Sequence, residues 1–266
     1  MNQLILIRGG GDLASGVALR LHHAGFRVVI TELPRPLAVR RLVSFSEAVY
    51  AGQTIVEDVT ARLVTADQLP VTLDASEIPV LIDPDADILL RFTFTAVVDA
   101  RLTKSSPLPL PTPVPLHIGL GPGFHAGRDC HAVIETRRGH ALGRVYWEGA
   151  TTPDSGQPEG DPRRVLRTEE DGLLIAHANI GDHLEKDQLV AEIQSKIVNR
   201  KFEVRSPFAG VLRGLLPEGT TVTRGLKLGD VDSRDDPAMC RLVSDKALAI
   251  GGAVLEAILA KNKSAL

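Results

Sequence analysis

The sequence has little cysteine: Cys130 and Cys240 are the only two in 266 residues. Two cysteines are too few for a disulfide framework or a cysteine-rich zinc site, and we expect both to be free thiols in a reducing cytoplasm. No apolar stretch approaches the roughly 18 residues that a membrane span requires. The short apolar run at the start also lacks the features of a secretory signal. The sequence therefore predicts a cytoplasmic protein with no membrane partner.

An excess of positive charge is also missing, because 30 basic residues face 33 acidic ones and the formal net charge is -3. There is no cluster of lysine and arginine interleaved with aromatic residues, so we expect no nucleic-acid partner. The length is typical of two modest domains, each able to bury its own core. We expect the chain to form a homo-oligomer.

The most informative pattern stands at the beginning of the chain. An apolar run at 4–7 leads into three consecutive glycines, and apolar residues then recur at helical spacing. Gly9, Gly11 and Ala14 have the G-x-G-x-x-A spacing, and the next apolar run ends on Glu32. This order of strand, glycine turn, helix and strand predicts an α/β, Rossmann-like N-terminal domain.

Each residue type in this turn has a physical role in binding a dinucleotide. Gly9 permits the sharp turn, Gly10 and Gly11 let a phosphate approach bare backbone, and Glu32 accepts hydrogen bonds from ribose hydroxyls. Asp12 argues for a different interpretation, because a carboxylate at the turn repels phosphate unless it caps the helix. In that alternative the glycines only form a tight turn and Glu32 is solvated.

Further along the N-terminal part, we expect a helix that begins after Pro36 and strands at 55–64 and 95–102. Asp99 lies near the carboxyl end of the latter strand, where ligands bind in open α/β sheets, so it is a candidate binding residue. A helix cap or an ion pair is the alternative role. The proline-rich stretch 107–115 cannot be helical and is predicted to be an extended connector.

A second glycine-rich loop follows the apolar strand predicted at 116–120. Gly121 and Gly123 lie in this loop, and His125 and His131 lie within or near it. Such a loop can wrap a ligand with backbone donors, and both glycine loops could open on one crevice. Its alternative role is packing between domains. The spacing of the histidines matches no common zinc motif, so we predict no metal site.

The C-terminal part repeats itself at an offset of 38 residues, with Gly172 and Gly181 matching Gly210 and Gly219. Two such halves interlock into one core, which predicts an all-β barrel-sandwich of the biotinyl/lipoyl type. The hairpin between the halves lacks a Met-Lys-Met motif. We therefore expect no biotin or lipoate on Lys196 or Lys201.

These patterns divide the chain into three parts. We predict a Rossmann-like domain with the second glycine loop at 1–150, a barrel-sandwich domain at 163–233, and a loop and helix at 234–266. Ser244 or Asp245 caps that helix, whose apolar face should dock on one of the domains.

The whole chain resembles the YqeB-type accessory family of selenium-dependent molybdenum hydroxylases. The resemblance is carried by RGGGDLASGVALRLHHAGFRVV, RRLVSFSEAVYAG, VVDARLTK, GLGPGFHAGRDCHAVIETRRGHALGRV and SDKALAIGGAVLEAIL. It implies a role in maturing a molybdenum hydroxylase, with that client enzyme or its cofactor as the partner. It names no catalytic residue and leaves open whether the chain is an enzyme.

Three functions compete at this point. The first is an accessory protein that binds a nucleotide or the molybdenum cofactor, with NAD or the dinucleotide form of molybdopterin as candidate ligands. The second is an NAD(P)-dependent oxidoreductase, which would need a proton donor that the sequence does not offer convincingly. The third is an interaction scaffold without a nucleotide.

Overall fold

The computed structural model describes residues 3–156, 161–195 and 200–263. The chain forms two compact units. Unit 1 comprises the described residues of 1–36, 44–155 and 243–266, and unit 2 comprises those of 37–43 and 156–242. The C-terminal helix, which the sequence analysis set apart with 234–266, thus belongs to unit 1.

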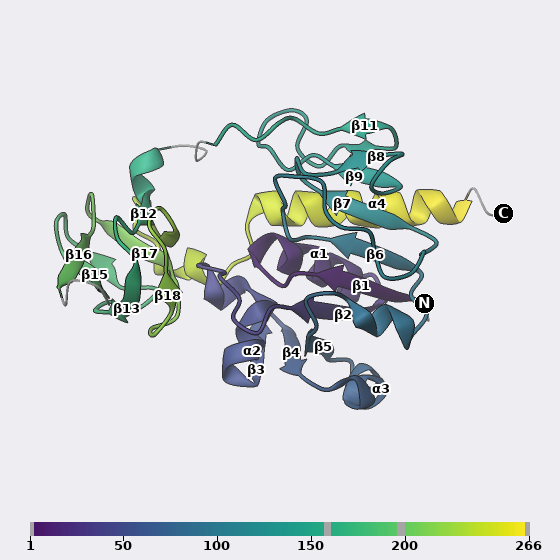
Figure 1. Cartoon of the computed structure of the whole chain (residues 1–266), viewed down its shortest axis with the longest axis horizontal. Coiled ribbons are helices and arrows are strands. Elements are labelled where there is room, and N and C mark those ends of the chain that lie inside the picture. The colour runs from purple at the N-terminus through teal and green to yellow at the C-terminus, as the bar shows by residue number, and fades with distance from the viewer. Residues whose placement is uncertain (1–2, 157–160, 196–199, 264–266) are drawn as a thin grey trace. The chain divides into compact units, whose positions relative to one another are not determined.

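Unit 1 is built on a nine-stranded sheet with the order β10-β9-β7-β6-β1-β2-β5-β4-β3 (Figure 1). Its strands are β1 (Leu4–Arg8), β2 (Arg27–Glu32), β3 (Gln53–Val56), β4 (Val59–Leu63), β5 (Ile78–Ile82), β6 (Ala96–Asp99), β7 (His117–Leu120), β9 (Ala132–Ile134) and β10 (Val145–Tyr146). A two-stranded sheet pairs β8 (His125–Ala126) with β11 (Gly149–Ala150). The seven inner strands run parallel, and β3 and β10 are antiparallel edges.

The central strands are continuous apolar runs because both faces of the sheet are covered. In β1, for example, Ile5, Leu6 and Ile7 are all fully buried. Leu6 belongs to a cluster on one face, together with Val29 and Val97 from the neighbouring strands. Since parallel strands end at the same edge, the loops that follow β1, β2, β4, β5, β6 and β7 lie at the carboxyl edge of the sheet.

Two helices of unit 1 pack directly on each other. The α-helices are α1 (Asp12–His23), α2 (Ala48–Ala51), α3 (Leu69–Asp74) and α4 (Asp245–Lys263). Helix α4 lies beside α1 (Figure 1), and a Cβ placed on Gly16 would meet Ala247 at 2.6 Å. A Cβ on Gly251 would likewise meet the Gly16 carbonyl oxygen at 2.6 Å. The small residues therefore set the close approach of the two helices.

The predicted Rossmann-like fold class is wrong for unit 1. A doubly wound fold alternates strands with helices, which cover both faces of the sheet. In the described part of residues 3–150, however, only α1 is longer than six residues, and no α-helix separates β6 from β7 or β7 from β9. Unit 1 is instead mostly sheet, and its longest helix, α4, comes from the C-terminal end of the chain.

Two local predictions in unit 1 also need correction. The helix expected after Pro36 is replaced by short 3-10 turns and α2, because residues 37–43 belong to unit 2. There the Val39 carbonyl accepts a hydrogen bond from the backbone N–H of Leu215. The single strand expected at 55–64 is a hairpin, β3 and β4, that turns at Glu57 with a φ of 54°. The 3-10 helices are η1 (Arg41–Val43), η2 (Phe45–Glu47), η3 (Ala66–Gln68), η4 (Asp87–Leu90), η5 (Pro162–Arg164) and η6 (Pro237–Cys240).

Unit 2 contains two four-stranded sheets, ordered β12-β19-β17-β14 and β16-β15-β13-β18. Its strands are β12 (Val165–Arg167), β13 (Gly172–Ala176), β14 (His183–Leu184), β15 (Leu189–Gln194), β16 (Lys201–Arg205), β17 (Gly210–Leu215), β18 (Thr221–Val222) and β19 (Lys227–Asp232). Each sheet combines strands from both halves of the repeat: β14 pairs with β17, and β18 pairs with β13. Neither half could form its sheet alone.

The 38-residue offset in the sequence reappears in the pairing register. Gly172 pairs with Val222, and the equivalent pair 38 residues away is Gly210 with Leu184. A Cβ on either glycine would collide with a backbone carbonyl, that of Gln194 or of Asp232. Both positions therefore require glycine for the same steric reason.

Of the two lysines considered as modification sites, the structure describes only Lys201. Lys196 lies outside the described residues. Lys201 lies in β16 and its ammonium group pairs with Glu192 at 2.9 Å.

Among the described residues, no helix has both the length and the apolar character to cross a membrane.

Candidate functional site

The first glycine turn is closed by the chain's own side chains. The backbone N–H of Gly10 donates to Oε1 of Glu32 at 2.6 Å, and the backbone N–H of Leu33 donates to Oε2 at 2.7 Å. Glu32 is buried, which raises its pKa, while its hydrogen bonds with Gly10 and Leu33 partly offset that rise. The Glu32 carboxylate thus accepts the hydrogen bond from the Gly10 amide that was expected to bind a ligand's phosphate.

Other contacts also fill this turn. The Gly10 carbonyl accepts from the backbone N–H of Ser46 at 2.9 Å, and the hydroxyl of Ser15 accepts from the N–H of Phe45 at 2.8 Å. Asp12 turns its carboxylate onto the N–H of Leu13 at the start of α1. Gly11 alone has open space, since no atom lies within 4 Å of an added Cβ. The two groups predicted to contact a nucleotide, the Gly10 amide and the Glu32 carboxylate, are thus hydrogen-bonded to each other in this structure.

Asp99 lies at the carboxyl end of β6, is fully buried and forms ion pairs with two arginines. Its carboxylate accepts from Arg101 at 2.6 Å and contacts the guanidinium of Arg8 at 3.5 Å. Burial and the nearby charge of Arg101 lower the pKa of Arg8, while the charge of Asp99 raises it. The ion-pair alternative for Asp99 describes this arrangement. Neither arginine was among the site residues predicted from the sequence, although Arg8 directly precedes the glycines and Arg101 follows Asp99 by two positions.

The loops after β1, β6 and β7 are neighbours along the carboxyl edge. Gly9 has a φ of 89°, and a Cβ there would lie 3.5 Å from the Ala100 backbone. In the second glycine loop, a Cβ on Gly121 would lie 3.6 Å from Leu102, and one on Gly123 would collide with the backbone of Thr103. The segment after β6 thus connects the two glycine loops by direct packing.

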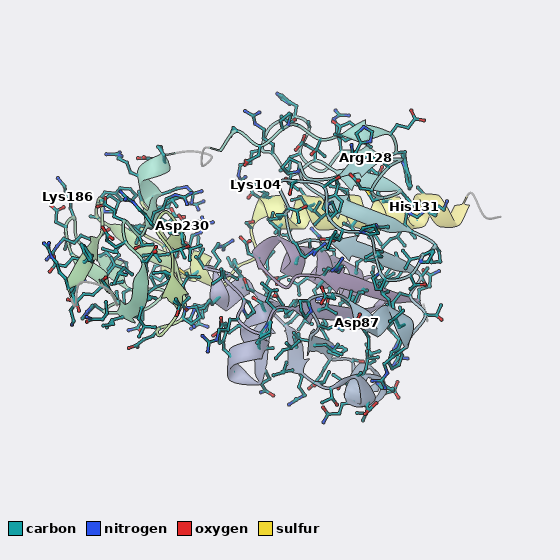
Figure 2. The ribbon with its side chains drawn as sticks, viewed as in Figure 1. Asp87, Lys104, Arg128, His131, Lys186 and Asp230 are labelled. Atoms are coloured by element: carbon teal, nitrogen blue, oxygen red, sulfur yellow. The ribbon has the colours of Figure 1, made fainter. Side chains whose placement is uncertain are left out.

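The two predicted histidines are not held at that edge together. His125 is half-buried in β8, where its backbone N–H donates to Asp129. His131 (Figure 2) precedes β9, and its Nδ1 accepts from the backbone N–H of His117 at the amino end of β7. Three residues of strand, roughly 10 Å, separate this point from the carboxyl edge. His131 therefore lies at the opposite edge from the first glycine turn.

His117 itself is a buried histidine that the sequence analysis missed. Its pKa is lowered to about 4, mainly by burial and also by the charges of Arg8 and His131, while the charge of Asp99 and a hydrogen bond with the Asp129 backbone oppose the shift. Its Nε2 has no hydrogen-bond partner among the described residues. The Phe124 ring packs edge-to-face against the imidazole, with 6.0 Å between the two ring centres. The neutral imidazole is thus part of the apolar packing on this face of the sheet.

A cavity of about 590 Å³ opens at the carboxyl ends of β4 and β5, and we call it the edge cavity. It is lined by Leu63, Val64, Thr65, Ala66, Gln68, Leu81, Ile82, Asp83, Asp87, Ile88 and Arg91. Aliphatic side chains form most of this wall. The sequence analysis missed the cavity, because residues from two strands and from η3 and η4 line it together.

The walls of the edge cavity are held by local capping interactions. Asp83 follows β5, and its two carboxylate oxygens accept from the backbone N–H groups of Asp87 and Ile88, each at 2.9 Å. On the other side, the side-chain Oε1 of Gln68 accepts from the backbone N–H of Thr65 at 3.0 Å. Both interactions tie a 3-10 turn to the strand that precedes it. The described residues contain no group of three or more metal-binding side chains.

Comparison with known proteins finds one sequence relative and several solved structures. No protein-family profile matches the chain. The chain is 43% identical over 263 residues to YqeB of Escherichia coli K12, a protein described as uncharacterized. The match covers 97% of this chain and 48% of YqeB, so the chain spans about half the length of that relative.

The solved structures are much less similar. The product-bound ectoine utilization protein EutE from Ruegeria pomeroyi is 13% identical, with 86% of this chain and 85% of that chain covered and a TM-score of 0.28. An aspartoacylase family protein from Mesorhizobium loti is 12% identical, with coverage of 87% and 85% and a TM-score of 0.28. A succinylglutamate desuccinylase from a Silicibacter species is 13% identical, with coverage of 86% and 84% and the same TM-score.

The family description drawn from the sequence needs correction. Two of the solved neighbours are named as an aspartoacylase family protein and a succinylglutamate desuccinylase, and neither name describes a Rossmann-like domain joined to a biotinyl/lipoyl-type barrel-sandwich. The architecture given to that family is wrong for this chain, because unit 1, as far as the structure describes it, lacks the alternating helices of a Rossmann-like domain; the sequence relative itself is an uncharacterized YqeB. Molybdenum hydroxylase maturation and Rossmann-like nucleotide binding are not what these neighbours are named for. The sequence relative YqeB is uncharacterized, so it does not test the maturation role.

Proposed function

We propose that this chain is a binding protein for a small organic molecule, which it holds in the edge cavity. The observation that carries the proposal is a cavity of about 590 Å³ at the carboxyl ends of two parallel strands. Cavities of roughly 300 to 1,000 Å³ are the size of ordinary small-molecule sites, and this edge is where open parallel sheets bind ligands. The proposal concerns the ligand and not a client enzyme.

The construction of the wall supports the same function. Leu81 and Ile88 belong to the buried cluster on one face of the sheet, so the floor of the cavity is fixed by core packing. Ile82, by contrast, is 47% exposed although it ends a buried strand. An apolar surface that is rigid and accessible can bind an apolar molecule without the cost of ordering a loop.

The proposal can be tested by filling the cavity. The substitution Ile82→Trp places an indole where the ligand would lie, and Ile55→Trp is the matched control on β3, because Ile55 is 59% exposed and does not line the cavity. Binding of the neutral probe 2-naphthalenemethanol is measured by calorimetry and by ligand-observed NMR. We expect binding to the unsubstituted chain and to Ile55→Trp, and loss of binding in Ile82→Trp. No binding to the unsubstituted chain, or equal binding in all three proteins, would contradict the proposal.

A further inference from the structure

The charged groups in the wall of the edge cavity restrict which ligand it can bind. Three lining residues carry charge: Asp83, Asp87 and Arg91. Their charges are not equally available to a ligand, because two of the three side chains already have partners within the protein. The third determines the chemistry of the site.

Arg91 is held by an acidic residue outside the cavity wall. Its guanidinium donates to Asp67 at 2.6 Å, and its central carbon lies 5.9 Å from the centre of the Phe92 ring. The negative charge of Asp67 offsets the positive charge of Arg91, which would otherwise attract an anionic ligand. Arg91 therefore contributes little attraction for a carboxylate or phosphate.

Asp83 is also engaged, since both carboxylate oxygens accept backbone hydrogen bonds at the start of η4. The nearby cation Arg8 donates to the carbonyl of Pro84 and contacts Asp99, and none of these three residues lines the cavity. The charges of Asp83 and Asp85 both act on Arg8. The positive charge of Arg8 is thus shared among acidic groups of the protein.

Asp87 differs from the other two. It is exposed and lines the cavity, and Figure 2 labels its position in unit 1. Among the described residues, its backbone N–H binds Asp83, but its carboxylate makes no hydrogen bond or ion pair. A carboxylate is only an acceptor, so it pairs with a ligand's N–H groups and repels a ligand's negative charge. The edge cavity therefore combines an aliphatic wall with one negatively charged hydrogen-bond acceptor that has no partner among the described residues.

From this arrangement we propose that the edge cavity selects an apolar organic molecule that carries an amino cation, which Asp87 binds. This inference rests on the proposed function and specifies the ligand class. It differs from the dinucleotides expected from the sequence, because their phosphates would face the uncompensated Asp87 carboxylate. The charged amine replaces its lost hydration with a charge-assisted hydrogen bond, while its apolar body contacts the aliphatic wall.

Three probes with one apolar body and different charges test this inference. They are 2-(aminomethyl)naphthalene, 2-naphthalenemethanol and 2-naphthoic acid, which are cationic, neutral and anionic at pH 7. We expect the amine to bind about tenfold more tightly than the alcohol, the ratio that 1.4 kcal/mol produces at 25 °C, and the acid to bind most weakly. Raising the ionic strength should reduce the advantage of the amine, since the site is open to water.

Two variants of equal charge change assign the effect to Asp87. Asp87→Asn should bring the amine to within about twofold of the alcohol, well inside one decade of affinity, without changing the affinity for the alcohol. Asp85→Asn is the control, because Asp85 is exposed nearby but does not line the cavity. It should leave the preference for the amine unchanged.

The outcomes separate this inference from the proposed function. If the acid binds as tightly as the amine, or if Asp87→Asn keeps the tenfold preference, the inference is wrong although the cavity is a binding site. If the alcohol fails to bind or ignores Ile82→Trp, the proposed function fails as well. An amine preference that only Asp87→Asn removes supports both.

Discussion

The backbone N–H of Gly10 and the Glu32 carboxylate form a hydrogen bond of 2.6 Å between residues 22 positions apart. A dinucleotide site would place a ligand between two such groups, one at the glycine turn and one at the end of the second strand. In this chain the two groups satisfy each other. The turn is therefore closed at Gly10, which should respond to substitution as part of a packed core, whereas Gly11 faces open space.

Substitutions at adjacent glycines of this turn should have different effects on stability. A Cβ on Gly10 would lie 2.9 Å from the Ser46 backbone nitrogen, whereas one on Gly11 meets nothing within 4 Å. We expect Gly10→Ser to lower the free energy of unfolding by about 1–3 kcal/mol through overpacking. Gly11→Ser should be nearly neutral, because serine is a favoured residue at the N-cap position that Gly11 occupies. Urea unfolding of both variants measures this, and equal losses would contradict the closed-turn description.

The contact between α1 and α4 gives a second pair of matched substitutions. Gly16→Ala places a methyl group 2.6 Å from Ala247, so we expect a loss of about 1–3 kcal/mol despite the better helix propensity of alanine. Gly252→Ala, also in α4, meets nothing within 4 Å and should gain up to about 1 kcal/mol. Thermal unfolding under identical conditions compares the two. A stabilising Gly16→Ala would show that the helices do not approach as closely as described.

The repeated register of unit 2 predicts equal effects at equivalent glycines. Gly172→Ala and Gly210→Ala each force a methyl group against a backbone carbonyl, of Gln194 in one case and Asp232 in the other. Each substitution should cost about 1–3 kcal/mol, and the two losses should be similar. Urea midpoints measured on the full chain test this prediction. Tolerance at one position and unfolding at the other would show that the halves are not sterically equivalent.

His117 should make stability depend on pH. Burial lowers its pKa to about 4 from 6.5, so between these values the unfolded chain binds a proton that the folded chain does not. The contribution of His117 to the free energy of unfolding should therefore be complete above about pH 7. It should be lost as the pH falls from 6.5 to 4, by about 3 kcal/mol in total. The measurement is urea unfolding at pH 7.0, 5.5 and 4.5.

Variants isolate this histidine from the other titrating groups. His117→Phe removes the proton that the unfolded chain takes up and keeps an aromatic ring beside Phe124, so its stability should depend less on pH. His140→Phe is the control, because His140 is exposed in the same unit. A wild-type pH slope in His117→Phe would mean that His117 is not the group responsible.

The sequence by itself determined the elements that depend on neighbouring residues. The apolar run before Gly9 and the helical spacing after Leu13 predicted β1 and α1 near their observed bounds. The 38-residue offset likewise predicted which strands of unit 2 are equivalent, and the pairing of Gly172 and Gly210 follows it. Backbone preference and hydrophobic period are local properties, so a single sequence displays them.

The tertiary structure alone decided which groups meet. Glu32 accepts a hydrogen bond from Gly10, His131 lies at the amino edge of the sheet, and α4 packs on α1 from the far end of the chain. The edge cavity, with the unengaged Asp87, exists only because η3 and η4 are placed beside two strand ends. Each of these contacts depends on strand order and on side-chain packing between distant segments, and local patterns in the sequence carry no record of either.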